Sequence, residues 1–289
     1  MVKLLSDNAP AKINLYLRVT GRREDGYHQL DSVFVLIELY DKLNTEVCPG
    51  AARIVELRCD AGALPVDEGN LAFRAARDFL NEFRIDAQVL VDLHKRIPVG
   101  AGLGGGSSDA GAVLRMLAAM CRINDSERLG AIALRLGADV PFFLNPVAAR
   151  VRGIGERIEP LGRIPELRLV IAVPPVEVST AEVFGALKPD QWSGPASAED
   201  VNSILQGQIA PALLVNDLAQ AAMAKFPVIA QLKELLEVSG ATAAAMTGSG
   251  GAVFGVYPST QAAEAAAREV ASRAPGARVF ATRTRQFSP

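Results

Sequence analysis

The alternation of apolar and polar side chains predicts two strands near the N-terminus. Over residues 11–19 the odd positions are apolar and the even positions polar, which is the period of a strand with one buried face. The pleat places four polar residues together on the other face: Lys12, Asn14, Tyr16 and Arg18. We expect Tyr16 and Arg18 to lie at the surface. Residues 33–37 are apolar throughout and predict a strand that is buried on both faces.

Helical periodicity follows. Apolar residues recur at steps of three and four over 70–84 and again over 110–121, which predicts two amphipathic helices. An alternating strand over 88–93 lies between them. Asn124 and Glu127 have the spacing of a capping box, and Gly137 suits a helix end, so we expect a third helix between these positions.

The second half of the chain alternates strands with helices. Its predicted elements are a hairpin over 148–161, a strand over 167–173, a helix opened by Ser179, helices near 198–205, 216–225 and 227–238, strands over 242–246 and 252–257, a helix from about 260, and a last strand over 277–282. Mixed elements in both halves favour an α+β fold. We place the domain boundary near residue 160, which gives domains over 1–160 and 161–289.

Composition and charge narrow the class of protein. The chain has 289 residues, 49% of them hydrophobic and 21% charged, as in globular proteins with a sizeable core. A net charge of −2 argues against a nucleic-acid or anionic-lipid partner. Three scattered cysteines and two histidines offer no metal-ligand spacing, and no apolar run reaches the roughly 20 residues of a membrane span. We therefore expect a cytoplasmic protein with reduced thiols.

A glycine-rich segment after the strand over 88–93 carries the strongest chemical signal. Its residues are Pro98, Val99, Gly100, Ala101, Gly102, Leu103, Gly104, Gly105, Gly106, Ser107 and Ser108. Glycines let a backbone approach a phosphate and turn its N–H groups inward, and the following helix start adds its positive dipole end. A flexible turn is the alternative, but so many glycines beside a helix cost conformational entropy. We interpret the segment as a phosphate-binding loop.

Two other nucleotide-binding motifs fit this segment less well. Gly100, Gly102 and Gly105 also match the dinucleotide pattern Gly-x-Gly-x-x-Gly. That pattern requires an acidic residue after the next strand, whereas Asp125, at about the right distance, lies beside a predicted helix start. A Walker A loop is excluded because no Gly-Lys-Ser/Thr follows the glycines.

The loop resembles the central motif of the small-molecule kinases grouped as galactokinase, homoserine kinase, mevalonate kinase and phosphomevalonate kinase. Three further motifs, in family order, resemble a member that acts on a cytidine diphosphate substrate. They are residues 10–15 with 25–28, residues 136–143, and residues 247–250. The resemblance runs from about residue 9 to the last predicted strand, and the motifs together are far more specific than the loop alone.

The resemblance implies an ATP-dependent kinase that requires Mg²⁺. It also implies a two-domain fold, with a ribosomal-protein-S5-like N-terminal domain that holds ATP and a ferredoxin-like α/β C-terminal domain that binds substrate. A monomer or weak homodimer is expected. Two alternatives stay open: a sister kinase that shares only the loop, and a non-catalytic ATP-binding protein. An NAD-dependent oxidoreductase is a third class that the dinucleotide pattern keeps in view.

Two residues match the family's catalytic pair. Asp139 matches the aspartate that takes the proton of the substrate hydroxyl, although an Asp just past a helix end is otherwise a common turn residue. Lys12 matches the catalytic lysine, whose charge lowers the pKa of that hydroxyl; a solvated lysine on a strand face is the alternative.

Other residues match the family's substrate and nucleotide sites. Tyr27 and His28 match the cytidine site, and Phe184 matches the opposing aromatic residue, although a lone Phe on a helix is more often in the core. Further assignments by resemblance are Asn14 as a substrate hydrogen-bonder, Thr180 as a phosphate contact or cap, Asn70 and Lys95 beside adenine, and Ser108 at the phosphates or the metal. Asp109 stands where many relatives carry Asn, which argues against a direct phosphate contact there.

Overall fold

The structure, a computed structural model, describes residues 1–285. It divides into two compact units: unit 1 comprises residues 1–11, 39–97 and 104–146, and unit 2 comprises residues 12–38, 98–103 and the chain from 147 onward. Neither unit is contiguous in sequence, because strands β1 (Lys3–Arg22) and β2 (His28–Pro49) supply residues to both. The sequence division at residue 160 stays a prediction.

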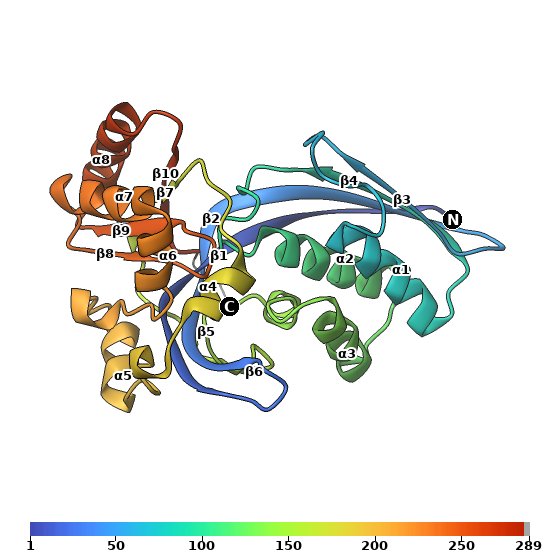
Figure 1. The fold of residues 1–289 in the computed structure, drawn as a ribbon. Helices are drawn as coiled ribbons and strands as arrows, with labels where there is room; N and C mark the ends of the chain where they lie inside the picture. The colour runs from blue at the N-terminus through green and yellow to red at the C-terminus, as the bar shows by residue number, and fades with distance from the viewer. Residues whose placement is uncertain (286–289) are drawn as a thin grey trace. The chain divides into compact units, whose positions relative to one another are not determined.

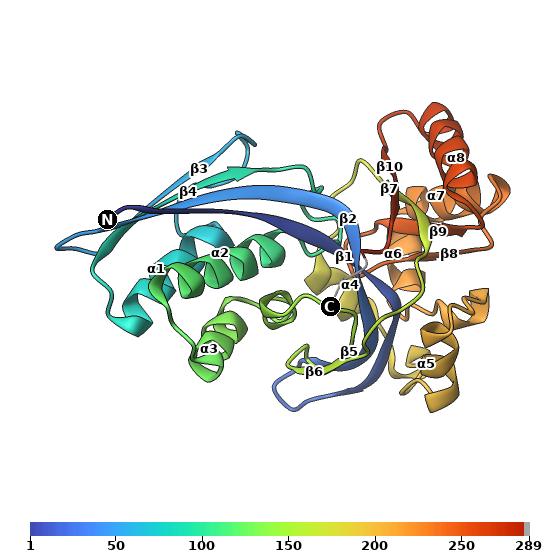
Figure 2. The same cartoon turned by 180° about the vertical axis from the view of Figure 1, so that it is seen from behind.

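Unit 1 packs helices against one face of a sheet. The end of β2 pairs antiparallel with β4 (Ala87–His94), and β4 pairs in parallel with β3 (Ile54–Cys59). Helices α1 (Leu71–Phe83) and α2 (Gly105–Cys121) lie under these strands, with α3 (Ser126–Leu136) beside α1 (Figure 1). Figure 2 shows the same layering from behind. A short 3-10 helix, η1 (Pro141–Leu144), follows α3.

The expected helices of unit 1 are confirmed, with one corrected cap. Asn70 caps α1 by accepting a hydrogen bond from Ala72 N, and Gly137 ends α3 as predicted. Asp125 caps α3, not Asn124: its carboxylate accepts the N–H of Arg128. An Asp at this position satisfies a free N–H and also suits the positive end of the helix dipole.

Unit 2 contains a second sheet and the hairpin. Antiparallel strands follow the order β10 (Arg278–Arg283), β7 (Arg168–Val173), β9 (Val253–Tyr257) and β8 (Ala243–Met246). Helices α7 (Pro227–Val238) and α8 (Thr260–Arg273) pack on this sheet, and α6 (Ala219–Lys225) packs on α7. Strands β5 (Ala149–Gly153) and β6 (Arg157–Pro160) form the predicted hairpin, and β5 pairs with the start of β2.

The connections of unit 2 carry shorter helices. They are α4 (Thr180–Ala186), η2 (Pro189–Gln191), α5 (Ala198–Leu205) and η3 (Pro211–Leu213). Ser179 caps α4 as expected, since its hydroxyl accepts the N–H of Glu182. The predicted helix over 216–225 begins three residues later, at Ala219.

The strand predicted over 11–19 is buried on both faces, so its surface assignment was wrong. Tyr16 is only 1% exposed, and the Arg18 side chain is 14% exposed. Tyr16 donates a hydrogen bond to Asp31, and Arg18 Nη2 pairs with Asp200, whereas Arg18 Nε has no partner among the described residues. A period-2 pattern therefore reports the polarity of a face and not its exposure.

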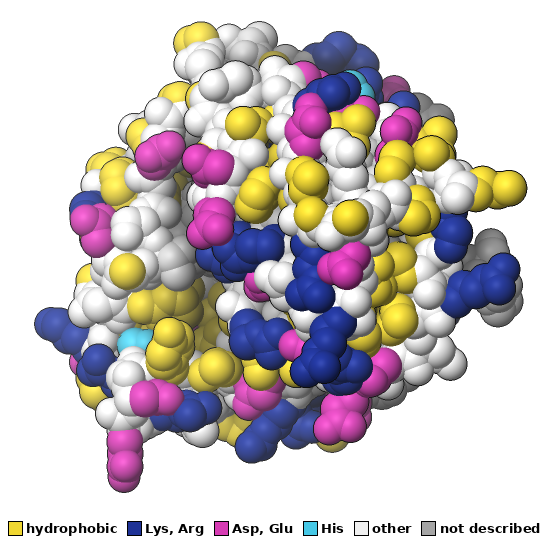
Figure 3. Space-filling model, turned by 90° about the vertical axis from the view of Figure 1, so that its right-hand side faces the viewer, with side chains coloured by type: hydrophobic (Ala, Val, Ile, Leu, Met, Phe, Trp, Pro, Cys, Tyr) yellow, Lys and Arg dark blue, Asp and Glu magenta, His cyan; other side chains and the backbone are white. Residues whose placement is uncertain are grey.

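Each unit has its own apolar core. The core of unit 1 includes Phe79, Val91 and Leu117, and that of unit 2 includes Val170, Ile229 and Leu236. Over residues 1–285 no helix has the length and apolar character that a bilayer crossing requires. The surface view in Figure 3 shows basic and acidic side chains interspersed on one face, in keeping with the small net charge.

Candidate functional site

The glycine-rich loop has the backbone conformation of an anion-binding turn. Gly100, Gly102 and Gly104 have φ of 70°, 81° and 72°, a region that favours glycine. Gly104 is also the N-cap residue of α2, whose first turn leaves N–H groups without intrahelical partners. A Cβ atom at Gly100 would meet no other atom within 4 Å, so space is open beside the backbone there. The loop therefore suits a phosphate group.

Two glycines of a second loop pack backbone to backbone against the first, within unit 2. A Cβ at Gly102 would lie 2.8 Å from the carbonyl oxygen of Thr247, and a Cβ at Gly250 would overlap the backbone of residues 100–102. A Cβ at Gly248 would lie 2.7 Å from the carbonyl oxygen of Gly102. Ala252 N also donates to Ala101 O over 3.2 Å. These glycines are thus required by close packing, which the sequence did not reveal.

A buried charge cluster supports the first turn of α2 in unit 1. Lys95 Nζ donates to the carboxylates of Asp41 and Asp109, the latter over 2.7 Å. Asp41 also accepts the N–H groups of Arg96 and Ile97, just before the glycine loop. Lys95, predicted beside adenine, therefore links the strand that enters the loop to the helix that leaves it, and its adenine contact stays a prediction.

Ser108 presents a buried hydroxyl near the loop. The residue is 0% exposed, and its Oγ has no hydrogen-bond partner among the described residues. A buried polar atom without a partner costs free energy, which a bound oxygen ligand or cation offsets. The described residues contain no cluster of three acidic, cysteine or histidine side chains that could hold a metal by themselves. A cation here would depend on phosphate oxygens, as Mg²⁺ in nucleotide sites commonly does.

Lys12 and Asn14 belong to a buried polar network of unit 2. Lys12 is 3% exposed, its Nζ donates to Asn14 Oδ1 over 2.7 Å, and the Phe34 ring centroid lies 4.6 Å from that nitrogen. The Asn14 amide nitrogen donates to Ser32 Oγ over 2.8 Å, and Asn14 Oδ1 also accepts a hydrogen bond from the Thr247 hydroxyl. Burial of Lys12 removes the plain alternative of a solvated surface lysine. The substrate contact expected of Asn14 stays a prediction.

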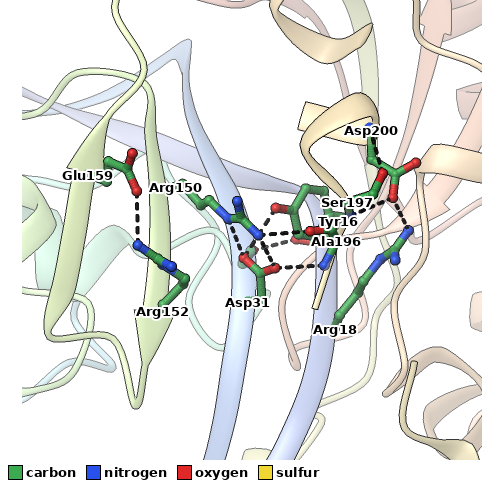
Figure 4. Close-up of polar contacts among 10 residues, drawn as sticks. Tyr16, Arg18, Asp31, Arg150, Arg152, Glu159, Ala196, Ser197 and Asp200 are labelled. Carbon is green, nitrogen blue, oxygen red and sulfur yellow. Dashed lines mark hydrogen bonds and ion pairs between the residues drawn. The ribbon is translucent and has the colours of Figure 1, made fainter. Parts of the chain in front are cut away.

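Asp31 and Arg150 form a buried pair that the sequence did not single out. Arg150 Nε and Nη2 donate to the two Asp31 carboxylate oxygens over 2.8 and 2.7 Å, the bidentate geometry of strong ion pairs. Burial would raise the pKa of Asp31, but the hydrogen bonds from Arg150 and from Ala196 N lower it below its usual value. Figure 4 shows this pair between β2 and β5, beside Tyr16 and Ala196. A lone Asp and a lone Arg far apart in sequence give no pattern that could have identified the pair.

Two of the three predicted aromatic residues of the cytidine site lie together. The His28 and Phe184 rings stack with centroids 5.2 Å apart and an interplanar angle of 28°. Trp192, which the sequence did not flag, meets the His28 ring edge-on at 6.0 Å. Tyr27 is 63% exposed, next to this group in sequence. Burial, then the positive charge of Arg22, lowers the pKa of His28, so its imidazole is neutral near pH 7.

The remaining predicted residues lie at element ends. Thr180 is the first residue of α4 and does not cap it, because Ser179 is the cap; its hydroxyl shares a 2.6 Å hydrogen bond with Ser249 of the second glycine loop. Asn70 is committed to capping α1 and to donating to Pro65 O. Asp139 lies half-buried in the turn between α3 and η1 of unit 1. The contacts of these residues with a nucleotide or substrate stay predictions.

Comparison with known proteins places these features in a family. Residues 70–145 match the family described as GHMP kinases N terminal domain, and residues 204–276 match the one described as GHMP kinases C terminal. A 4-diphosphocytidyl-2-C-methyl-D-erythritol kinase of Anaeromyxobacter dehalogenans (strain 2CP-C) is 43% identical over 273 residues, which cover 93% of this chain and 85% of that protein. One from Deinococcus radiodurans is 40% identical over 281 residues, covering 96% and 92%.

Solved structures show the same relationship. The crystal structure of a 4-(cytidine 5'-diphospho)-2C-methyl-D-erythritol kinase matches with a TM-score of 0.83 and 36% identity, and covers 98% of this chain and 100% of that chain. A homoserine kinase from Cytophaga hutchinsonii matches with a TM-score of 0.74 over 98% and 95% of the two chains. At 17% identity the latter likeness concerns the fold alone.

Proposed function

This chain belongs to the GHMP kinases and, within them, to the 4-diphosphocytidyl-2-C-methyl-D-erythritol kinases, and we propose that it phosphorylates the 2-hydroxyl of that cytidine diphosphate compound. As a GHMP kinase it uses ATP, and the products are the 2-phosphate and ADP, in the non-mevalonate pathway to isoprenoids. The observation that carries the substrate assignment is the stacked pair of His28 and Phe184, because a nucleobase needs a flat aromatic site.

The glycine loop holds the triphosphate of ATP. Its left-handed glycines and the N-terminus of α2 present backbone N–H groups and a positive dipole end, which favour an anion without a side-chain charge. Kinases supply mainly positioning and charge stabilisation, since the transferred phosphoryl group needs little covalent assistance. The loop therefore provides a large part of the positioning and charge stabilisation that phosphoryl transfer requires.

Asp139 serves as the base and Lys12 as the positive group at the acceptor. The 2-hydroxyl oxygen forms a bond to the γ-phosphorus, its proton passes to the Asp139 carboxylate, and the bond from the γ-phosphorus to the β–γ bridging oxygen breaks to release ADP. A buried ammonium such as that of Lys12 acts more strongly on a nearby hydroxyl than an exposed one would.

Ser108 fits a nucleotide-bound Mg²⁺. Its buried hydroxyl without a partner is an oxygen donor of the kind that Mg²⁺ prefers, and the phosphates of ATP would supply further oxygens. When bound, the cation neutralises charge that develops on the phosphates. Asp109 is held by Lys95 and does not compete for this role.

His28 recognises the cytosine edge as a neutral imidazole. Because its pKa is lowered, the ring is neutral at pH 7. One ring nitrogen then carries a proton and donates a hydrogen bond, and the other accepts a hydrogen bond. Tyr27 and Phe184 contribute ring faces to the base. A cytoplasmic location and a monomeric or weakly dimeric state remain predictions of the sequence.

The assignment of Asp139 is tested by Asp139→Asn. We expect the variant to bind an ATP analogue with unchanged affinity and to lose roughly 10²–10⁴-fold in kcat, because the amide cannot take the hydroxyl proton. Asp92→Asn, on strand β4 of the same unit, is the matched control and should keep normal turnover. Turnover of Asp139→Asn within a few-fold of the unaltered protein would remove Asp139 from the mechanism.

A further inference from the structure

The segment that joins α4 to α5 carries an aromatic residue that the proposed function leaves without a role. Trp192 lies in this segment, directly after η2, and its ring meets the His28 ring edge-on at 6.0 Å with an interplanar angle of 90°. Edge-to-face pairs of this kind add to the free energy of burial alone. Since His28 also stacks on Phe184, the three rings form one aromatic group within unit 2.

The chain just after Trp192 is fixed by Asp217. One carboxylate oxygen of Asp217 accepts the backbone N–H of Ser193 over 2.9 Å and that of Val19 over 2.7 Å, and the other accepts the Ser193 hydroxyl. Gly194 N donates to Val19 O over 3.2 Å. Asp217 is 8% exposed, and its bond to Val19 N is buried, whereas its bonds to Ser193 are partly buried. The segment is therefore tied to strand β1 one residue beyond the tryptophan.

The Asp31–Arg150 pair fixes the same segment four residues beyond Trp192. Asp31 Oδ2 accepts Ala196 N over 2.8 Å, while Arg150 Nη2 donates to Ala196 O over 3.0 Å. Both backbone polar groups of one residue are thus bound by the two members of a single ion pair (Figure 4). Asp31 is 1% exposed, and the Arg150 side chain is 17% exposed. Removing two charges from water costs more free energy than most buried ion pairs return. Stability alone therefore does not explain why this pair is present.

A third contact secures the start of α5. Arg18 pairs with Asp200 over 3.2 Å, and Asp200 and Ser197 form a reciprocal capping box. Figure 4 shows Ser197 and Asp200 beyond Ala196 on this segment, with Arg18 of β1 reaching Asp200. The segment from 193 to 200 is therefore held at successive points by polar groups of β1, β2, β5 and Asp217, directly after Trp192, which packs on the apolar core of unit 2.

We propose that Trp192 is a further wall of the nucleobase site and that Asp31 and Arg150 are positioning residues, which hold it beside His28 by binding Ala196. The proposal rests on the proposed function, because it deepens the same cytidine site. A loop held in place before the ligand arrives loses less conformational entropy on binding. Positioning of the segment explains the presence of this buried pair, which its contribution to the stability of the fold does not.

Trp192 is also the only tryptophan of the chain, so its fluorescence reports this position directly. We expect CDP to change the emission of the unaltered protein in a saturable way. Trp192→Leu should raise the KM for the cytidyl substrate by about three- to tenfold, the range typical of lost aromatic stacking, with kcat and the KM for ATP unchanged. Trp192→Phe should restore most of the affinity.

Arg150→Lys tests the positioning role, with Arg152→Lys as its matched control. Lysine keeps the charge at residue 150 but loses the planar fork that binds Asp31 and Ala196 at once. We expect Trp192 emission to shift to longer wavelength and the KM for the cytidyl substrate to rise, with kcat retained. Arg152 lies two residues along β5, and its side chain pairs with exposed Glu159 (Figure 4), so Arg152→Lys should change neither.

The outcomes separate this proposal from the proposed function. Absence of turnover of the cytidyl substrate by the unaltered protein would contradict the proposed function. Two results together would overturn the role of Trp192. The KM of Trp192→Leu for the cytidyl substrate would be unchanged, and Trp192 emission would stay constant although calorimetry shows that CDP binds. If Arg150→Lys raised KM and left emission unchanged, the positioning role would be overturned, while Trp192→Leu would still test whether Trp192 contacts the base.

Discussion

Asp41, Lys95 and Asp109 place two carboxylates around one ammonium in the interior of unit 1, so the cluster has one acidic group in excess. Asp41 accepts two backbone N–H groups besides Lys95, whereas Asp109 Oδ1 has no partner among the described residues. Burial raises the pKa of Asp109 to about 7. The positive charge of Lys95 opposes this rise, and the like charge of Asp41 adds to it.

The raised pKa of Asp109 predicts how the free energy of unfolding depends on pH. The pKa of Asp109 is near 7 in the folded chain and about 3.9 in the unfolded one, so between these values the folded chain holds a proton that the unfolded chain has released. The stabilising contribution of this group is therefore complete below about pH 4 and is lost as the pH rises through 7. Asp109→Asn cannot titrate and has nearly the same shape.

We expect the free energy of unfolding of Asp109→Asn to gain on that of the unaltered protein as the pH rises from 4 to 8, measured by urea unfolding. Lys95→Met should instead cost about 3–5 kcal/mol at pH 8, because it leaves two buried carboxylates without a counter-ion. A constant difference between Asp109→Asn and the unaltered protein across this pH range would contradict the raised pKa.

At the scale of elements, the two glycine-rich loops of unit 2 depend on each other for their shape. Residues 98–103 and 247–251 approach so closely that side chains at Gly102, Gly248 and Gly250 have no room. The second loop therefore fixes the conformation in which the first presents its N–H groups. Sequence motifs identified both loops but not their mutual packing, because close approach between segments about 150 residues apart leaves no periodic trace.

Gly250→Ala tests this dependence. Its Cβ would overlap the backbone of residues 100–102, and overpacking of this kind typically costs about 1–3 kcal/mol. We expect lower thermal stability together with a clearly weaker affinity for an ATP analogue, measured by calorimetry. Gly130→Ala, on α3, is the control: its Cβ would meet nothing within 4 Å, and the change should stabilise by about 0.5–1 kcal/mol. Unaltered ATP affinity in Gly250→Ala would show that the loops act independently.

Elements with clear periodicity were predictable, and those shaped by tertiary contacts were not. Helices α1 and α2 and the hairpin β5–β6 follow directly from spacing and turn residues. Strand β3 was not predicted, although residues 55–59 alternate, because a short strand of moderate polarity lacks a distinct boundary. Strand β1 is longer than predicted and is buried on both faces over residues 9–17, where Asn14 and Tyr16 donate hydrogen bonds inside the fold.

At the scale of the whole molecule, resemblance and structure contribute different parts of the account. Motifs suggested the family, which the relatives confirm, and proposed Lys12, Asp139, His28 and Phe184. The structure adds Asp31, Arg150 and Asp217, which bind the segment that follows Trp192 and are single residues without a local sequence pattern. Positioning depends on three-dimensional complementarity, so it could not be deduced from one sequence.

On the proposed function, the aromatic site selects a cytidine diphosphate substrate for this GHMP kinase. The most direct test is a competition assay in which the purified protein receives Mg-ATP with equal concentrations of 4-diphosphocytidyl-2-C-methyl-D-erythritol, homoserine and mevalonate. Phosphorus NMR and mass spectrometry would identify the phosphorylated product. We predict a single product, the 2-phosphate of the cytidyl compound. Phosphorylation of homoserine or mevalonate, with the cytidyl compound unchanged, would contradict the account.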